Sequence, residues 1–107
     1  MSQHVKRLLD FAESRADKHF KDTLFQEANL LLGINCLDPG QAQHVHSHAD
    51  QTKFYYVAEG RGWFTVGEEE FEAAVGEVVW ASAGVPHGVE NRGDSRLTLL
   101  MGIAPSP

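Results

Sequence analysis

A chain of 107 residues, 42% of them apolar, is long enough for one domain with its own core, and we expect a single domain over residues 1–107. The formal net charge is −6, and lysines and arginines form no cluster, so we expect no nucleic-acid partner. The apolar runs are far shorter than the ~20 residues of a membrane span, and the pattern of residues 1–10 leads us to expect no signal peptide. We therefore expect a cytoplasmic protein with no membrane partner.

The first quarter of the chain is expected to form an arm, about residues 1–24, ahead of the β-rich part. Apolar residues recur near helical spacing over residues 8–20, which predicts a short helix or turn. Residues 25–37 indicate two strands with a tight connection at 26–29. A lone cysteine cannot form an intrachain disulfide, so Cys36, in the second of these strands, is expected to be a small buried side chain.

The remainder of the chain consists of short apolar and aromatic runs between glycine-centred breaks about ten residues apart. These runs cover residues 54–58, 63–66, 78–81 and 97–103. Short strands at this spacing are typical of an all-β sandwich or barrel. Residues 63–73 predict a hairpin with an acidic, solvated tip at 68–70. No internal repeat is present, so we expect one barrel.

Histidines are the most informative residues. His44, His46 and His48 alternate along one predicted strand, so their imidazoles can project from the same face. Two such imidazoles can bind one divalent metal ion, and Fe, Mn, Ni, Cu and Zn all accept imidazole. His87, which follows a turn in the β-rich half, is the candidate third ligand. The alternative is that these histidines are ordinary surface residues.

The spacing around these histidines resembles the two sequence motifs of the cupin superfamily. The first motif runs Gly, five residues, His-x-His, three or four residues, Glu, six residues, Gly. Its positions here hold Gly40, His46, His48, Lys53 and Gly60. The second motif runs Gly, five residues, Pro-x-Gly, two residues, His, three residues, Asn. Its positions here hold Gly76, Ser82, Gly84, His87 and Asn91.

The resemblance, carried by residues 40–60 and 76–91, implies an all-β double-stranded β-helix barrel with a metal ion inside, bound by His46, His48 and His87. His44 falls outside the family's ligand set and is expected at the barrel rim. The resemblance also implies pairing through the N-terminal strands, so we expect a homodimer. The candidate interface residues are Phe20, Leu24 and Phe25.

One departure from the family pattern affects the metal site directly. Lys53 stands where the family has glutamate, and an ammonium group has no lone pair for a metal. Three outcomes are open. Lys53 can point away and leave three neutral imidazoles with open positions, or Gln51 can supply an amide oxygen as fourth ligand. In the third outcome the metal site is degraded and the pocket binds an organic ligand.

A small molecule in the barrel pocket is the expected ligand. If Lys53 faces inward, Tyr55 does so too, and Trp80 and Met101 are further pocket candidates. No residue is marked as a nucleophile. The resemblance implies a metal-dependent dioxygenase, isomerase or cyclase, of the kind found among small bacterial cupins of antibiotic and polyketide synthesis. The alternative is a non-catalytic ligand-binding or sensor cupin, and the sequence leaves catalysis open.

Overall fold

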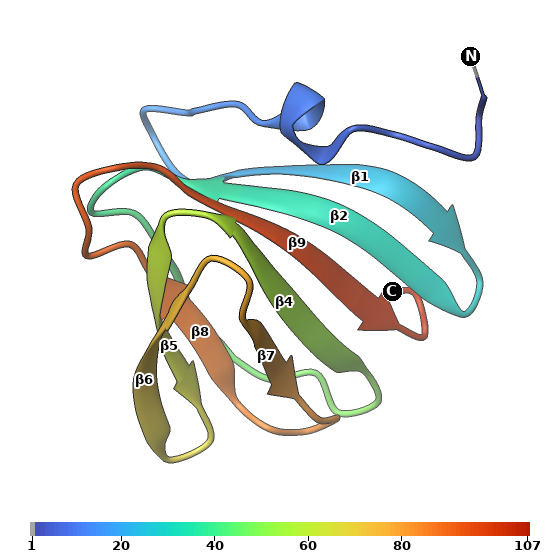
Figure 1. Ribbon diagram of the computed structural model, residues 1–107. Coiled ribbons are helices and arrows are strands. Elements are labelled where there is room, and N and C mark those ends of the chain that lie inside the picture. The colour runs from blue at the N-terminus through green and yellow to red at the C-terminus, as the bar shows by residue number, and fades with distance from the viewer. Residues whose placement is uncertain (1) are drawn as a thin grey trace.

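The computed structural model describes residues 2–107 as two antiparallel β-sheets that face each other (Figure 1). A single 3-10 turn, η1, spans Leu8–Phe11. The strands are β1 Phe20–Glu27, β2 Leu30–Leu37, β3 Ala42–His46, β4 Thr52–Glu59, β5 Arg61–Val66, β6 Glu69–Ala74, β7 Val78–Ala81, β8 His87–Glu90 and β9 Leu97–Ala104. The prediction of an all-β, double-stranded β-helix is confirmed.

Strand order explains how distant parts of the chain meet. The five-stranded sheet has the order β1-β2-β9-β4-β7, and the four-stranded sheet has the order β3-β8-β5-β6. The connection expected at residues 26–29 is a shorter turn at 28–29, because β1 continues to Glu27. The hairpin expected over residues 63–73 is the antiparallel pair β5–β6. The two halves of the sequence that carry histidines become neighbours because β3 pairs with β8.

The core lies between the two sheets. Successive side chains of a strand point to opposite faces, so on β4 the odd-numbered residues face inward. Tyr55 and Val57 are fully buried there, and the Tyr55 ring lies 5.5 Å, centroid to centroid, from the ring of Phe64 on the opposite sheet. Burying aromatic and branched side chains from both sheets is the main stabilising contribution to the fold.

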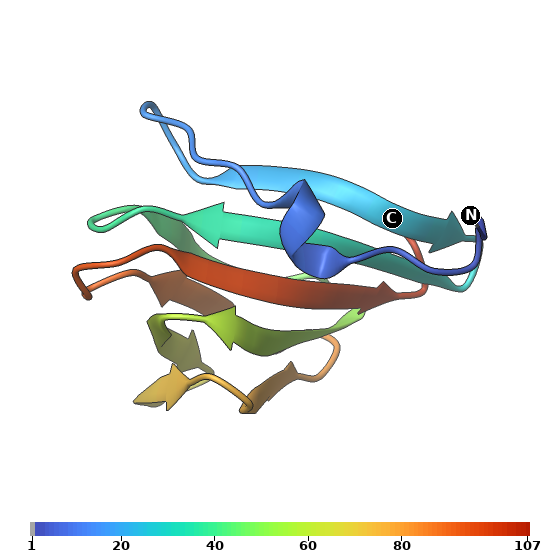
Figure 2. The same cartoon turned by 45° about the horizontal axis from the view of Figure 1, so that its top comes forward.

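The N-terminal arm crosses the outer face of the larger sheet, as Figure 2 shows. Of the short helix or turn expected over residues 8–20, a turn forms at Leu8–Phe11, and the remainder of the segment is not helical. Residues 12–19 instead run without regular structure beside the sheet, where Glu13 lies against Cys36. Cys36 is 1% exposed, which confirms its expected burial. This burial raises the pKa of its thiol.

Apolar side chains of β1 differ in their surroundings. Leu24 is buried within the chain itself, which removes it from the candidate dimer interface. Phe25 stays exposed, with the Lys6 ammonium 4.7 Å from its ring centroid. Within residues 2–107 no helix has the length and apolar character that crossing a membrane requires.

Candidate metal centre

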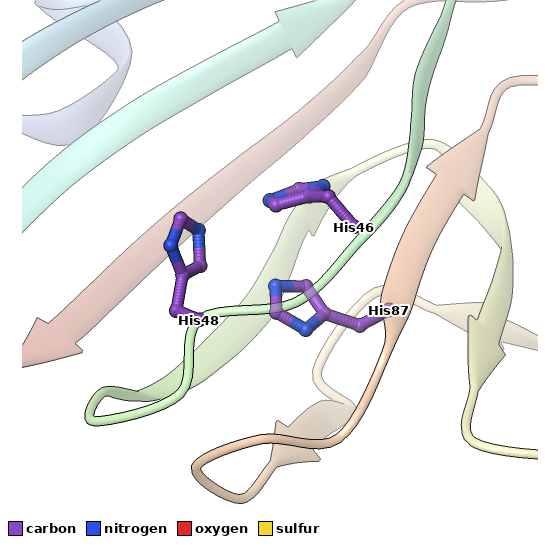
Figure 3. A group of neighbouring side chains, drawn as sticks. All are labelled: His46, His48 and His87. Atoms are coloured by element: carbon purple, nitrogen blue, oxygen red, sulfur yellow. The ribbon is translucent and has the colours of Figure 1, made fainter.

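Three imidazoles point toward one another at one end of the space between the sheets (Figure 3). His46 ends β3, His48 lies in the loop that follows, and His87 begins β8. Their candidate ligand nitrogens all lie within 4.8 Å of one another. The three predicted ligands are therefore brought together by the fold, although they come from segments about 40 residues apart.

Hydrogen bonds select the tautomer of two of these rings in their neutral form. Nδ1 of His46 donates to the His44 carbonyl at 2.8 Å, and Nδ1 of His87 donates to the Val85 carbonyl at 2.9 Å. A carbonyl can only accept, so in the neutral ring the lone pair lies on Nε2. Nε2 of His87 is buried and has no hydrogen-bond partner among the described residues. A buried, unpartnered lone pair facing two other imidazoles fits a divalent ion that accepts nitrogen ligands.

Burial favours the neutral, metal-binding form of two of the rings. His87 is 2% exposed, and burial lowers its pKa, as do the neighbouring His46, Lys53 and His48. Burial also lowers the pKa of His48. Only neutral imidazole can bind a metal ion, so the surroundings of both rings favour metal binding at neutral pH.

A β-bulge directs the first histidine inward. Gln43 pairs with Val89 and His46 pairs with His87, so β3 advances three residues where β8 advances two. The extra residue changes the alternation, and both Gln43 and His46 face the interior. The strand is therefore irregular between Gln43 and His46, although His44, His46 and His48 all line one cavity, as expected.

His48 is positioned by a loop contact, because β3 ends at His46. The Gly84 amide donates to the His48 carbonyl at 2.8 Å and thus ties the loop after β3 to the turn before β8. Gly84 has φ +82°, a left-handed conformation that glycine adopts without strain. Gly84 of the second motif therefore helps to position His48 in the site.

Gly88 is a residue that sequence reasoning missed. A Cβ at this position would lie 2.9 Å from the Gln43 carbonyl oxygen and 2.9 Å from the Val45 amide nitrogen, both in the bulge. The bulge can pack against β8 only because residue 88 has no side chain. A glycine directly after a metal-binding histidine was the available signal.

Gly88→Ala is accordingly expected to displace the bulge and with it His46. We expect a loss of about 1–3 kcal/mol in the free energy of unfolding from overpacking, and metal binding weakened about tenfold or more. Chemical denaturation and metal titration measure the two effects. Gly93→Ala is the matched control, because a Cβ at Gly93 meets nothing closer than 3.4 Å. Equal free energies of unfolding and equal metal affinities of the two variants would contradict the role of Gly88.

Lys53 faces inward, so an outward-facing lysine at this position is excluded. Its side chain is 5% exposed and lines the same cavity as His46 and His48. Burial, reinforced by the charge of Lys21, lowers its pKa to about 8. Its Nζ lies 4.9 Å from the ring centroid of Tyr55, and among residues 2–107 it forms no ion pair.

Of the other predicted site residues, three line the cavity and one lies on the outer face of the sheet. Met101 lines the cavity, and His44 lies at its exposed rim as expected. Gln51 also lines the cavity, but its Nε2 donates to the Pro105 carbonyl at 3.0 Å, so only its oxygen is available to a metal. Trp80 is 60% exposed and stacks on Phe54 on the outer face, so its expected place in the pocket is wrong.

Two polar residues of the cavity, one partly and one fully buried, were also missed. Gln43 accepts a hydrogen bond from the Tyr55 hydroxyl at 3.0 Å, which joins the two sheets beside the histidines. Asn35 is 2% exposed, and its Nδ2 has no partner among the described residues. A lone polar residue inside the apolar run of β2 was the signal for Asn35, whereas Gln43 depends on the bulge and gave none.

Comparison with known proteins decides the family. Residues 33–103 match the family described as the cupin domain. The chain belongs to this family. The cupin is similar to the TT1209 protein of Thermus thermophilus, at 42% identity and a TM-score of 0.93 over 96% of this chain and 98% of the other. A double-stranded β-helix protein of Klebsiella pneumoniae shares the fold at 17% identity, with a TM-score of 0.88 over 94% and 89% of the two chains.

A third relative of this cupin carries a functional name. It is the oxalate-binding protein of Thermotoga maritima, 28% identical over 80 residues, which are 75% of this chain and 65% of the relative. The matched segments span 49–65% of the lengths of the curated relatives. These similarities establish the fold and the family of the chain.

Proposed function

We propose that this cupin binds one divalent metal ion through His46, His48 and His87 and uses it to act on a small organic molecule in the cavity. The observation that supports this most strongly is the buried Nε2 of His87, which has a lone pair, no hydrogen-bond partner within residues 2–107, and two imidazoles facing it. Leaving such a group unsatisfied costs free energy, and a metal ion removes that cost.

The reaction we propose is of the dioxygenase, isomerase or cyclase kind. A bound Fe, Mn, Ni, Cu or Zn ion supplies Lewis acidity and open coordination positions to a substrate oxygen. The protein contributes the surrounding groups. Gln43 lines the cavity and accepts a hydrogen bond from the hydroxyl of the fully buried Tyr55. Burial raises the pKa of Tyr55, so its phenol keeps the proton that it donates to Gln43. Met101 and Ile103 give the cavity an apolar wall against which a carbon skeleton can pack.

A non-catalytic binding protein is the second candidate function. The name of the Thermotoga maritima relative says that a similar protein binds oxalate. Within the described residues of this chain, no side chain of the cavity is arranged as an activated nucleophile. Under this alternative the metal and the cavity hold a ligand without converting it.

Metal analysis of the purified protein tests the proposal. We expect close to one divalent ion per chain after reconstitution, with the identity of the ion given by elemental analysis. Gln51→Ala is expected to reduce occupancy only if the amide oxygen is a fourth ligand; unchanged occupancy assigns the site to three imidazoles. Absence of metal from reconstituted wild-type protein would remove the basis of the proposal.

Assembly and location are further proposals. We infer a homodimer in the cytoplasm, formed through the first two strands, where Phe25 and Leu30 are 37% and 41% exposed. Apolar surface on an edge hairpin is stabilised by pairing with a second copy. Light scattering that gives the mass of one chain would contradict the dimer.

A further inference from the structure

The cavity beside the histidines has a charge opposite to that of the whole protein. The chain has fifteen acidic residues and nine lysines and arginines, yet no aspartate or glutamate lines this cavity of ≈ 400 Å³. An acidic protein that keeps its carboxylates out of one cavity presents a site for an anion there.

Lys53 is the principal cation of this cavity. Its side chain is nine-tenths or more buried and pairs with no carboxylate in residues 2–107. Lys21 adds a second positive charge from β1, where it pairs with Asn35 of β2. Burying an unpaired ammonium group is costly, and a bound anion removes much of that cost.

Asn35 supplies a second unused group. Its side chain is 2% exposed, lines the same cavity, and has an Nδ2 without any acceptor among the described residues. Hydrogen-bond donors buried in this way are rare in folded proteins, because each costs free energy until it is paired. Asn35 and Lys53 come from different strands of one sheet, β2 and β4, with β9 between them.

We propose that the cavity binds a small organic carboxylate, with Lys53 as the countercharge and Asn35 Nδ2 as a hydrogen-bond donor to the ligand. The apolar side chains of Met101 and Ile103 favour a carboxylate with a carbon body over an inorganic anion. The inference rests on the proposed function in one respect. Three neutral imidazoles leave both charges of a divalent ion uncompensated, and this adds to the attraction for an anion.

Calorimetric titration of metal-free protein with glutarate and benzoate tests this proposal, with glutaramide and benzamide as their neutral counterparts. We expect at least one carboxylate to bind about tenfold or more tightly than its amide, since a charge-assisted hydrogen bond distinguishes them. Lys53→Met should remove this preference, and Asn35→Leu should weaken carboxylate binding about threefold or more. Lys18→Met, which changes an exposed lysine of the arm, is the matched control. It should change neither the preference for carboxylate over amide nor the affinity for the carboxylate.

Three outcomes would overturn the proposal. They are equal binding of each carboxylate and its amide, a preference that survives Lys53→Met, and binding of inorganic phosphate as tight as that of the carboxylates. Thermal unfolding of each variant shows whether it is folded, and Lys53→Gln provides a second neutral variant. Metal content is measured separately. A chain that binds no metal but retains the Lys53-dependent preference would refute the proposed metal-dependent function and would still support the carboxylate site.

Discussion

Replacing His87 by alanine is expected to abolish stoichiometric metal binding. The imidazole is the buried member of the three ligands, and its Nδ1 bond to Val85 already directs Nε2 toward His46 and His48. Loss of a residue that only orients a ligand costs 10–100-fold in affinity, so loss of the ligand itself should cost about 100-fold or more. Competition against a chromophoric chelator measures the affinity.

Two further variants show whether such a loss reflects the site or the fold. His87→Ala also leaves a cavity in the interior, so His87→Gln, which keeps more of the volume, is compared with it by circular dichroism and thermal unfolding. His4→Ala removes an exposed imidazole of the arm and should bind metal as the wild type does. One tightly bound ion per chain in both folded His87 variants would refute the three-histidine centre.

Much of the fold could be predicted because the motif residues act locally. The Gly40 amide donates to the Asn91 carbonyl at 2.9 Å, and the Asn91 side chain donates to the Leu37 and Ser95 carbonyls. These contacts join the turns at which strands pass between the sheets. A turn depends on a few residues at fixed spacing, so its sequence pattern is visible without the structure.

The site could be predicted less completely, because its details depend on how strands pair. Alternation correctly places Tyr55 and Phe54 on opposite faces of β4. It cannot show that Trp80 pairs with Phe54 and therefore lies on the outer face of the sheet. A bulge of one residue in β3 likewise brings Gln43 inside with His46. Register and bulges are set by contacts between distant segments, which no single stretch of sequence displays.

The arm shows the same limitation for helical patterns. Leu8, Phe11 and Ala12 recur at helical spacing, yet only one turn forms. The apolar residues of this segment lie over the outer face of β1 and β2, where Ile34 is fully buried (Figure 2). Contact with a sheet can satisfy apolar residues in an irregular segment, so tertiary packing overrides the local preference for a helix.

Replacing Lys53 by methionine is expected to stabilise the folded protein at pH 7. Burial lowers the pKa of Lys53 from 10.5 to about 8, so below pH 8 the ammonium is charged in both folded and unfolded chains and its burial cost is fully present. A shift of this size corresponds to about 3 kcal/mol. Methionine has similar length, carries no charge, and keeps a favourable contact with the Tyr55 ring.

The sign of the pH dependence distinguishes this cause from better packing. Between pH 8 and 10.5 the folded wild type releases the Lys53 proton before the unfolded chain does, so the stability of the wild type rises relative to that of the variant. Urea denaturation of metal-free protein at pH 7, 8.5 and 10 should therefore show the advantage of Lys53→Met shrinking as the pH rises. Lys18→Met, which removes an exposed charge, should show no such trend. An advantage that stays constant with pH would assign the gain to packing.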